Sequence, residues 1–522
     1  MLRQIGWSDA FWVATGAPAL VLFSIGAIAA TVGNPSWMVW TISIAIGFLQ
    51  AFTYAEIAGM YPTKSGGGAV YGAMAWLPYG KIMGPSSVWT NWRGWSPVLS
   101  IGTAIAAGYI LSILFAPDAA INTWSVTLID LGFLQDKLLL RINATAVLGA
   151  VLILVCFAIQ HRGLLGSARI QAWFAVCSLL PLTLIGVLPI VTGDLPLANF
   201  APFVPLDHVA DKVVAGHWGM AGVTLFVGGL FIAAWSTYGF ETAMVYTREF
   251  RDPRKDTFRA MLSAGLLCLF MFTVIPVSFQ GALGLNGMLD PAIYDGSGVG
   301  KAMARMVGAS GIAANVIVVM LVLTLLLAIM TAMSGSSRTL YQGARDGFLP
   351  KFLARVNGHG APARAMGVDL VFNLLLLLLS DDVFLLAISN VNYLIFIFLN
   401  SNAGWIHRMD RPGWTRPFRA PSWLLGVAAV LGFANMFVIG MGAPTYGRGV
   451  LLSGFTATLC IVPIFLYRHY VTDRGKFPIE LEEEEHPFSD ARAVLSRAGY
   501  LPYLALVGAA AAVVIGNLLA VT

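Results

Sequence analysis

Two short stretches, far apart in the chain, decide the fold. Thr15-Gly16-Ala17-Pro18 lies inside the first apolar segment, and Trp235-Ser236-Thr237-Tyr238-Gly239-Phe240-Glu241-Thr242 lies inside a later one. Proline removes one backbone hydrogen bond of a helix, and glycine tolerates distorted backbone angles. Each stretch therefore predicts a helix that is interrupted in the middle of an apolar run.

The rest of the chain is mainly apolar. Hydrophobic residues make up 58% of its 522 residues, charged residues make up only 11%, and the mean hydropathy is +0.77. A spanning helix needs about 20 consecutive apolar residues, and such runs occur along almost the whole length. This composition excludes an ordinary cytosolic enzyme and predicts an all-α polytopic membrane protein without a large soluble domain.

Apolar windows bounded by polar residues, glycine or proline predict twelve spanning helices. They cover residues 8–32, 36–60, 84–116, 139–160, 168–192, 220–247, 258–284, 308–335, 364–380, 383–405, 422–442 and 450–468. A charged segment (469–499) is expected to form a cytoplasmic tail. A further apolar stretch in 500–522 is long enough to span as a thirteenth helix. The alternative is a helix that lies in the interface or on a partner subunit.

The basic residues predict the orientation. With a cytoplasmic N-terminus, 24 of the 31 lysines and arginines fall on the cytoplasmic side and six on the outer side. By the positive-inside rule this asymmetry predicts an N-inside protein of the inner cell membrane. The net charge of +5 thus arises from short loops, and nucleic acid is not expected as a partner.

The two interruptions fall in the first and sixth predicted spans. For either one alone, a kink or close helix packing is the commoner explanation. The five-helix interval, however, fits a five-plus-five inverted repeat, in which broken helices leave backbone groups free to bind substrate near the midplane. The predicted transporter core (1–468) then contains repeat one (about 8–192), repeat two (about 220–405) and two further helices (about 422–468).

Two ionisable residues lie well inside predicted spans, where a charge costs about 3 kcal/mol on insertion scales. Glu241 would begin the second half of the interrupted sixth helix, and its protonation could follow opening and closing of the site. Arg93 adjoins Trp92, and it could hold a substrate carboxylate by paired hydrogen bonds. Alternatively, Arg93 and Glu241 neutralise each other, or Arg93 extends to the cytoplasmic surface.

Four strings of sequence occur at corresponding places after these spans. They are YAEIAGMYPTKSGGGAVYG (54–72), WSTYGFETA with REFRDPRKDTFRA (235–243 and 248–260), SSRTLYQGARDGFLP (336–350) and RPFRAP (416–421). Together they resemble the amino acid-polyamine-organocation (APC) superfamily over roughly residues 8–468. The resemblance implies a LeuT-like fold and the proton- or sodium-driven uptake or exchange of amino acids, polyamines or related small amines.

The same resemblance implies where substrate binds. Contacts are expected at both interruptions and in the third span, at Gly16, Ala17, Ala19, Leu20, Asn91, Trp235, Ser236, Tyr238 and Gly239. Amides of the first interruption would bind a carboxylate, but Pro18 has no amide hydrogen and the usual Gly-Ser-Gly-like triplet is missing. Arg93 would replace part of that anchor, Trp235 would close over substrate, and Glu241 would serve pH-dependent exchange.

The coupling ion stays open between a proton and sodium. Several proton-coupled relatives have a lysine midway through the fifth span, where this chain has Ser178. Sodium-coupled members use hydroxyls of the eighth helix, and Thr331 and Ser334 lie at about the right depth. The alternative is that these hydroxyls bond their own backbone. No other cofactor is expected, because the cysteines and histidines show no metal-ligand spacing.

These features predict a secondary transporter for a small amino acid or related carboxylate-bearing compound, working as a symporter or antiporter. A polyamine or other organic amine is an alternative substrate. A transporter-like nutrient sensor, with the charged tail (468–497) as its contact surface, is an alternative function. No enzyme is expected, because no nucleophile and base are paired in a membrane segment. The expected partners are a small molecule and the lipid bilayer, and the oligomeric state is left open.

Overall fold

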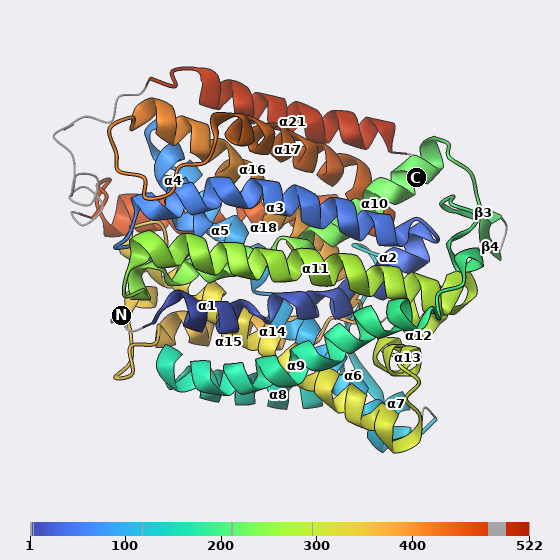
Figure 1. Ribbon diagram of the computed structural model, residues 1–522. Helices are drawn as coiled ribbons and strands as arrows, with labels where there is room; N and C mark the ends of the chain where they lie inside the picture. The colour runs from blue at the N-terminus through green and yellow to red at the C-terminus, as the bar shows by residue number, and fades with distance from the viewer. Residues whose placement is uncertain are drawn as a thin grey trace.

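The computed structural model describes residues 3, 5–116, 118–209, 212–294, 296–478 and 497–520. Long helices run side by side and form a bundle (Figure 1). Within the described residues, eleven helical segments are long and apolar enough to cross a membrane, the first being Trp7–Val32 and the last Leu501–Leu519. The prediction of an all-α polytopic membrane protein is confirmed.

The first half of the bundle contains several spans that are divided at proline or glycine. Its elements are α1 (Trp7–Ala14), the 3-10 helix η1 (Ala17–Leu20), α2 (Val21–Val32), α3 (Ser36–Met60), α4 (Gly68–Trp76), η2 (Leu77–Tyr79), α5 (Met83–Trp95), α6 (Val98–Leu114), α7 (Ala120–Thr123), α8 (Ala144–Gln160), α9 (Leu164–Thr192) and η3 (Leu197–Phe200). Pro97 separates α5 from α6, because proline cannot donate to the helical ladder.

The second half contains the longest helices. Its elements are α10 (Met220–Thr237), the 3-10 helix η4 (Gly239–Glu249), α11 (Pro253–Met288), α12 (Pro291–Tyr294), α13 (Val299–Met306), α14 (Gly311–Arg345), η5 (Lys351–Ala354), α15 (Ala363–Leu376), α16 (Asp382–Asp410), α17 (Ser422–Gly442), η6 (Ala443–Tyr446), α18 (Val450–Leu459), α19 (Ile461–Leu466), the π-helix η7 (Tyr467–Thr472) and α21 (Leu501–Leu519).

Two predicted spans form shorter helices than expected. α8 has 17 residues and α15 has 14, whereas a straight crossing needs about 20. Residues 139–143, predicted to begin the fourth span, instead form a β-strand. Asn143 then caps α8 by accepting a hydrogen bond from the Ala146 amide at 2.8 Å, and a capping asparagine fixes where a helix starts.

Two short antiparallel sheets occur in the connecting loops and were not predicted from the sequence. β1 (Ser125–Asp130) pairs with β2 (Leu139–Asn143), and β3 (Leu206–Val209) pairs with β4 (Lys212–Ala215). The β3–β4 hairpin lies at the end of the bundle away from the N-terminus (Figure 1). Both sheets connect helices and leave the all-α character of the bundle unchanged.

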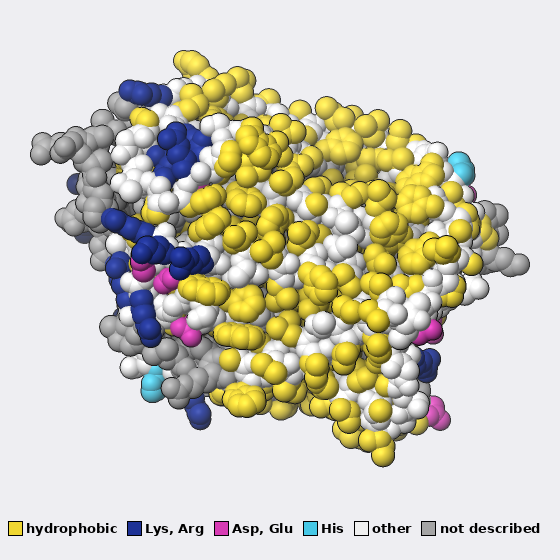
Figure 2. Space-filling model, in the orientation of Figure 1, with side chains coloured by type: hydrophobic (Ala, Val, Ile, Leu, Met, Phe, Trp, Pro, Cys, Tyr) yellow, Lys and Arg dark blue, Asp and Glu magenta, His cyan; other side chains and the backbone are white. Residues whose placement is uncertain are grey.

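The surface carries a broad apolar band with basic residues at one end. On the face shown in Figure 2, hydrophobic side chains cover the middle, and Lys and Arg gather at the end that holds the N-terminus. Lipid tails require such a band, and basic residues concentrate on the cytoplasmic side of membrane proteins. This distribution suits the N-inside orientation, which together with the inner-membrane location stays a prediction.

The predicted thirteenth helix is part of the bundle, because α21 packs closely along α17. A Cβ atom on Gly440 would lie 2.0 Å from the Val513 carbonyl oxygen, and one on Gly516 would lie 2.4 Å from that of Phe437. Only glycine allows two helix backbones to approach this closely. Residues 479–496 of the predicted charged tail, with its glutamates, lie outside the described residues.

Candidate functional site

Both predicted interruptions are present. The first span changes from α1 to the 3-10 turn η1 and back to α2, with Thr15 and Gly16 between α1 and η1. The sixth span changes at Tyr238 from α10 to η4, a 3-10 helix of 11 residues. 3-10 helices rarely exceed about four residues, and such stretches inside a span often mark functional hinges.

The two interruptions meet. The hydroxyl oxygens of Ser24 in α2 and Ser236 in α10 lie 2.9 Å apart. A Cβ atom on Gly239 would come within 2.9 Å of Leu20 Cδ1 and 2.7 Å of Trp95 Cη2. Glycine is therefore required where the sixth span turns against the first span and α5. Gly16, Ala17, Ala19 and Leu20 are all buried at this junction.

Glu241 lies two residues after Gly239, at the start of η4, and only 5% of its surface is exposed. One carboxylate oxygen, Oε1, accepts hydrogen bonds from Trp95 Nε1 at 3.3 Å and from the Tyr393 hydroxyl at 3.1 Å. The other oxygen, Oε2, is buried without a hydrogen-bond partner among the described residues. A buried acceptor left unpaired is costly, so Oε2 has unused capacity for a proton, a water molecule or a cationic group.

A narrow cavity of about 10 Å³ adjoins Glu241. It is bordered by Asn91, Trp95, Thr242, Thr339 and the three glycines 66–68. This volume holds roughly one water molecule. Asn91 Oδ1 accepts a hydrogen bond from Thr339 Oγ1 at 3.2 Å, which joins α5 to α14 beside the cavity. The space around the carboxylate is thus nearly closed in this conformation.

The two aromatic residues predicted at the sixth-span interruption point in different directions. Trp235 donates from Nε1 to the Gly94 carbonyl oxygen at 2.9 Å, so its ring is held against α5. The Tyr238 hydroxyl bonds to Asn435 Oδ1 of α17 at 3.4 Å. A Cβ atom on Gly47 would lie 2.2 Å from the Tyr238 ring. Trp235 therefore lies with the central residues, whereas Tyr238 packs between α3 and α17.

The Arg93 side chain points away from Glu241. Asn91 and Trp95 border the central cavity, and residue 93, two positions from each, projects from the opposite face of α5. The Arg93 guanidinium lies over the Phe372 ring of α15, with its carbon 4.7 Å from the ring centroid. This cation–π contact places the charge outside the central cluster. No ion pair joins Arg93 and Glu241 within the described part of the chain.

The hydroxyls proposed for sodium already have protein partners. Thr331 Oγ1 donates to the Val13 carbonyl oxygen at 2.5 Å, across the first interruption. Ser334 Oγ accepts from Arg338 Nη1 at 2.8 Å. Ser178, at the expected lysine position, bonds to its own helix at the Ala175 carbonyl oxygen. No group of three or more His, Cys, Asp and Glu suited to a metal occurs in the described residues.

The four sequence strings are joined by buried ion pairs. Lys64 pairs with Asp346 at 2.9 Å, and Arg338 pairs with Glu249 at 2.6 Å. Glu56 pairs with Arg408 at 2.7 Å and with Arg416 at 3.1 Å. All lie toward the basic end of the bundle, and most of these side chains are nearly inaccessible. Strings that are far apart in sequence therefore meet at one end of the molecule.

Asp369 of α15 is a buried carboxylate that the sequence reasoning missed. Its Oδ1 accepts hydrogen bonds from Trp92 Nε1 at 2.9 Å and Ser96 Oγ at 2.5 Å, and its Oδ2 accepts from Ser336 Oγ at 2.5 Å. These donors lie on α5, at the α5–α6 junction and on α14. A signal was present, because Asp369 and Asn373 are one helical turn apart in an apolar segment.

Comparison with known proteins agrees with this architecture. A family model described as amino acid permease matches residues 5–466. The chain is 23% identical over 368 residues to the branched-chain amino acid permease BcaP of Lactococcus lactis subsp. cremoris (strain MG1363), covering 68% of this chain and 71% of that relative. It is 24% identical over 429 residues to the polyamine transporter PUT1 of Oryza sativa subsp. japonica, covering 81% of this chain and 69% of that relative.

A third similarity is shorter. The histidine permease HisP of the same Lactococcus lactis strain is 26% identical over 168 residues, covering 31% of this chain and 34% of that relative. The family match begins just before the first predicted span and ends within the twelfth. The chain belongs to the amino acid permease family of the APC superfamily, and it is a multi-pass membrane transporter rather than an enzyme.

Proposed function

We propose that the protein moves a small amino acid or related carboxylate-bearing compound across the inner membrane by alternating access. The observation that carries this proposal is the junction of the two interrupted spans, with Glu241 directly beyond it. Substrate would bind at Gly16, Ala17, Ala19 and Leu20 and beneath Trp235, where an interrupted helix presents backbone groups. Ser236, Gly239 and Asn91 border the same region.

The substrate test is uptake into proteoliposomes made with the purified full chain. The twenty protein amino acids and the polyamines are offered as radiolabelled compounds, with and without sodium and with and without a pH gradient. We expect uptake of at least one amino acid above protein-free liposomes, with a dependence on the coupling ion. Uptake of none of the amino acids would contradict the proposal.

We propose that Glu241 gains and loses a proton during the cycle. Its unpaired Oε2 supports this role, because protonation changes the charge next to a nearly closed cavity. Glu241→Gln keeps the hydrogen bonds to Oε1 but cannot titrate. We expect Glu241→Gln to flatten the pH dependence of uptake between pH 5 and pH 8, while the purified protein stays monodisperse. An unchanged pH profile would exclude a titrating role for Glu241.

An organic amine is the second candidate substrate. The observation in its favour is charge, because the central cluster contains the Glu241 carboxylate while Arg93 lies against Phe372 on the opposite face of α5. A carboxylate without a nearby cation is suited to an ammonium group. Putrescine uptake that is lost in Glu241→Gln, together with no amino acid uptake, would establish this alternative.

We propose a proton rather than sodium as the coupling ion. Ser334 Oγ accepts a hydrogen bond from the Arg338 guanidinium at 2.8 Å, so a sodium ion bound to this hydroxyl would lie beside a fixed positive charge. Uptake driven by a pH gradient in sodium-free buffer is the expected result. Strict dependence on sodium, abolished in Thr331→Ala, would instead support the sodium site.

A further inference from the structure

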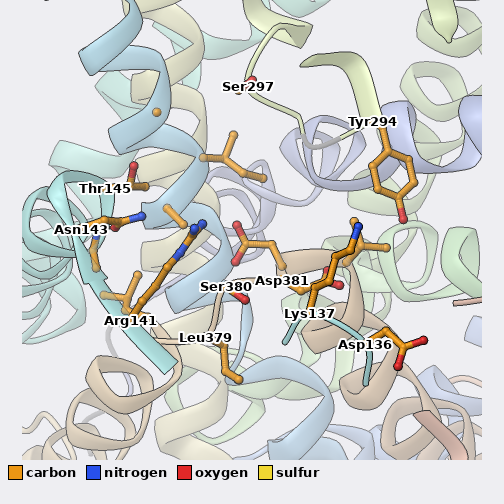
Figure 3. A pocket seen from close by; sticks show the side chains of 17 residues that line it. Asp136, Lys137, Arg141, Asn143, Thr145, Tyr294, Ser297, Leu379, Ser380 and Asp381 are labelled. Atoms are coloured by element: carbon orange, nitrogen blue, oxygen red, sulfur yellow. Dashed lines mark hydrogen bonds between the residues drawn. The ribbon is translucent and has the colours of Figure 1, made fainter. Parts of the chain in front are cut away.

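A second cavity, of about 510 Å³, lies at the end of the bundle opposite the N-terminus, which the positive-inside rule predicts to be the outer face. Its walls come from α6, from the β1–β2 turn with β2 and the start of α8, from the end of α12 with Ser297, and from residues 377–383, which lead from the end of α15 into the start of α16. Figure 3 shows it from close by. None of its lining residues borders the cavity beside Glu241.

Hydrogen bonds join the two walls of this cavity that carry the charged side chains, β2 and the loop after α15. The Arg141 amide donates to the Leu378 carbonyl oxygen at 2.7 Å, and the Ser380 amide donates to the Leu139 carbonyl oxygen at 2.9 Å. Ser380 Oγ also accepts from the Leu139 amide at 2.9 Å. The loop between α15 and α16 thus extends the β1–β2 sheet. Because both walls share backbone hydrogen bonds, the distance between their side chains is largely preset.

Charged side chains of both signs line the cavity, namely Lys137 and Arg141 with Asp136, Asp381 and Asp382, and Asp136 pairs with Arg448 outside the lining. Lys137 and Arg141 extend from the hairpin toward the space that Asp381 borders (Figure 3). Within the described residues, none of these three side chains forms an ion pair. Asp381 Oδ1 caps α16 by accepting from the Phe384 amide at 2.9 Å, which fixes the carboxylate at the rim. Unpaired opposite charges in one rigid cavity complement a ligand that carries both.

We propose that this cavity binds a free α-amino acid as a zwitterion, before the amino acid reaches the central site. Arg141 receives the carboxylate through paired hydrogen bonds, and Asp381 receives the ammonium group. Lys137 adds positive charge beside the carboxylate. The volume lies within the range of about 300–1,000 Å³ found for small-molecule sites. The choice of ligand rests on the proposed function, whereas the site itself is separate from the central one.

The test counts bound molecules. The probe is whichever of the twenty protein amino acids most stabilises the purified full chain against thermal unfolding. Equilibrium binding of that amino acid, radiolabelled, is expected to give two sites per chain. Arg141→Gln should leave one site and raise the apparent KM for uptake about tenfold, the effect of losing one charged contact. Asp381→Asn should act likewise while keeping the helix cap.

Controls separate this site from general charge effects and from the proposed function. Arg305→Gln removes an exposed charge at the same end of the molecule but outside the cavity, and it should retain two sites. Blocking either the amino or the carboxyl group of the probe should abolish the Arg141-dependent site. One site per chain in the wild type, or two in both Arg141→Gln and Asp381→Asn, would overturn this proposal alone. Binding and uptake of none of the twenty amino acids would overturn the proposed function with it.

Discussion

At the scale of single residues, the direction of a side chain matters as much as its chemistry. Arg93 and Trp95 are only two residues apart in the sequence, yet Trp95 donates to Glu241 and Arg93 stacks on Phe372. An α-helix turns about 100° per residue, so residues two apart point to nearly opposite sides. The hypothesis that Arg93 recognises a substrate carboxylate therefore gains no support from its position.

Replacing Arg93 gives the corresponding test. Arg93→Ala should change the apparent KM for amino acid uptake by less than about threefold, because a partly exposed cation–π contact contributes about 0.5–1 kcal/mol and does not touch the central cluster. Uptake kinetics in proteoliposomes measure the effect. A collapse of uptake in monodisperse Arg93→Ala protein would restore the carboxylate-binding hypothesis.

Asp369 makes a different prediction, for stability. Asp369→Ala would leave Trp92 Nε1, Ser96 Oγ and Ser336 Oγ without their shared acceptor in a fully buried place. Each unpaired buried donor costs about 1–3 kcal/mol, so thermal unfolding in detergent should occur at a clearly lower temperature. Asp369→Asn keeps one acceptor oxygen and should lose less.

The matched control for this prediction is Asp194→Ala, which removes an exposed aspartate in the loop after α9. We expect that variant to unfold at the wild-type temperature, because surface substitutions rarely change stability by more than about 0.5 kcal/mol. Equal unfolding temperatures for Asp369→Ala and the wild type would show that the three hydrogen bonds contribute nothing to stability.

At the scale of helices, the first interruption is fixed by its contact with α14. A Cβ atom on Gly16 would lie 2.4 Å from Thr331 Oγ1 and 2.9 Å from Ala328 Cα. Neither neighbour can move away easily, because Thr331 donates a hydrogen bond to Val13 and Ala328 Cα belongs to the backbone of α14. Gly16→Ala should therefore separate α1 from α14 and reduce uptake at least about tenfold.

A second glycine substitution controls for the change itself. Gly367→Ala adds the same methyl group to α15, where nothing lies within 4 Å of the added atom. It should keep normal uptake, because alanine is the better helix former by about 1 kcal/mol. If Gly16→Ala also transports normally, the close approach of η1 and α14 is not required for function.

The spanning helices could be predicted from the sequence more accurately than the loops that connect them. Residues 36–60 and 422–442 match α3 and α17 at both ends, because long apolar runs with polar flanks leave one solution in lipid. Gly16 and Gly239 correctly marked the two interruptions. The hairpins were missed because loop hydrogen bonds such as Arg141 to Leu378 depend on tertiary contacts. The five-plus-five repeat and the domain boundaries stay predictions, as do the roles of the central residues.

At the scale of the whole molecule, the last helix, α21, carries the C-terminus to the end of the bundle opposite the N-terminus (Figure 1). The two chain ends, marked N and C, lie toward opposite ends of the bundle (Figure 1). Alkaline phosphatase fused after Leu519 should be active in cells, because it needs the outer compartment, whereas green fluorescent protein at the N-terminus should fluoresce. Fluorescent protein fused after Lys476, before α21, should fluoresce as well. Fluorescence from a fusion after Leu519 would contradict the crossing of α21.

The buried ion pairs at the basic end have a consequence for any opening of that end. Lys64, Glu249, Arg338 and Asp346 come from both halves of the chain, and each pair spans two sequence strings. Separating them requires water to enter and solvate four charges that are now dehydrated. Under the proposed alternating access, opening the basic end of the bundle therefore requires both ion pairs to become hydrated.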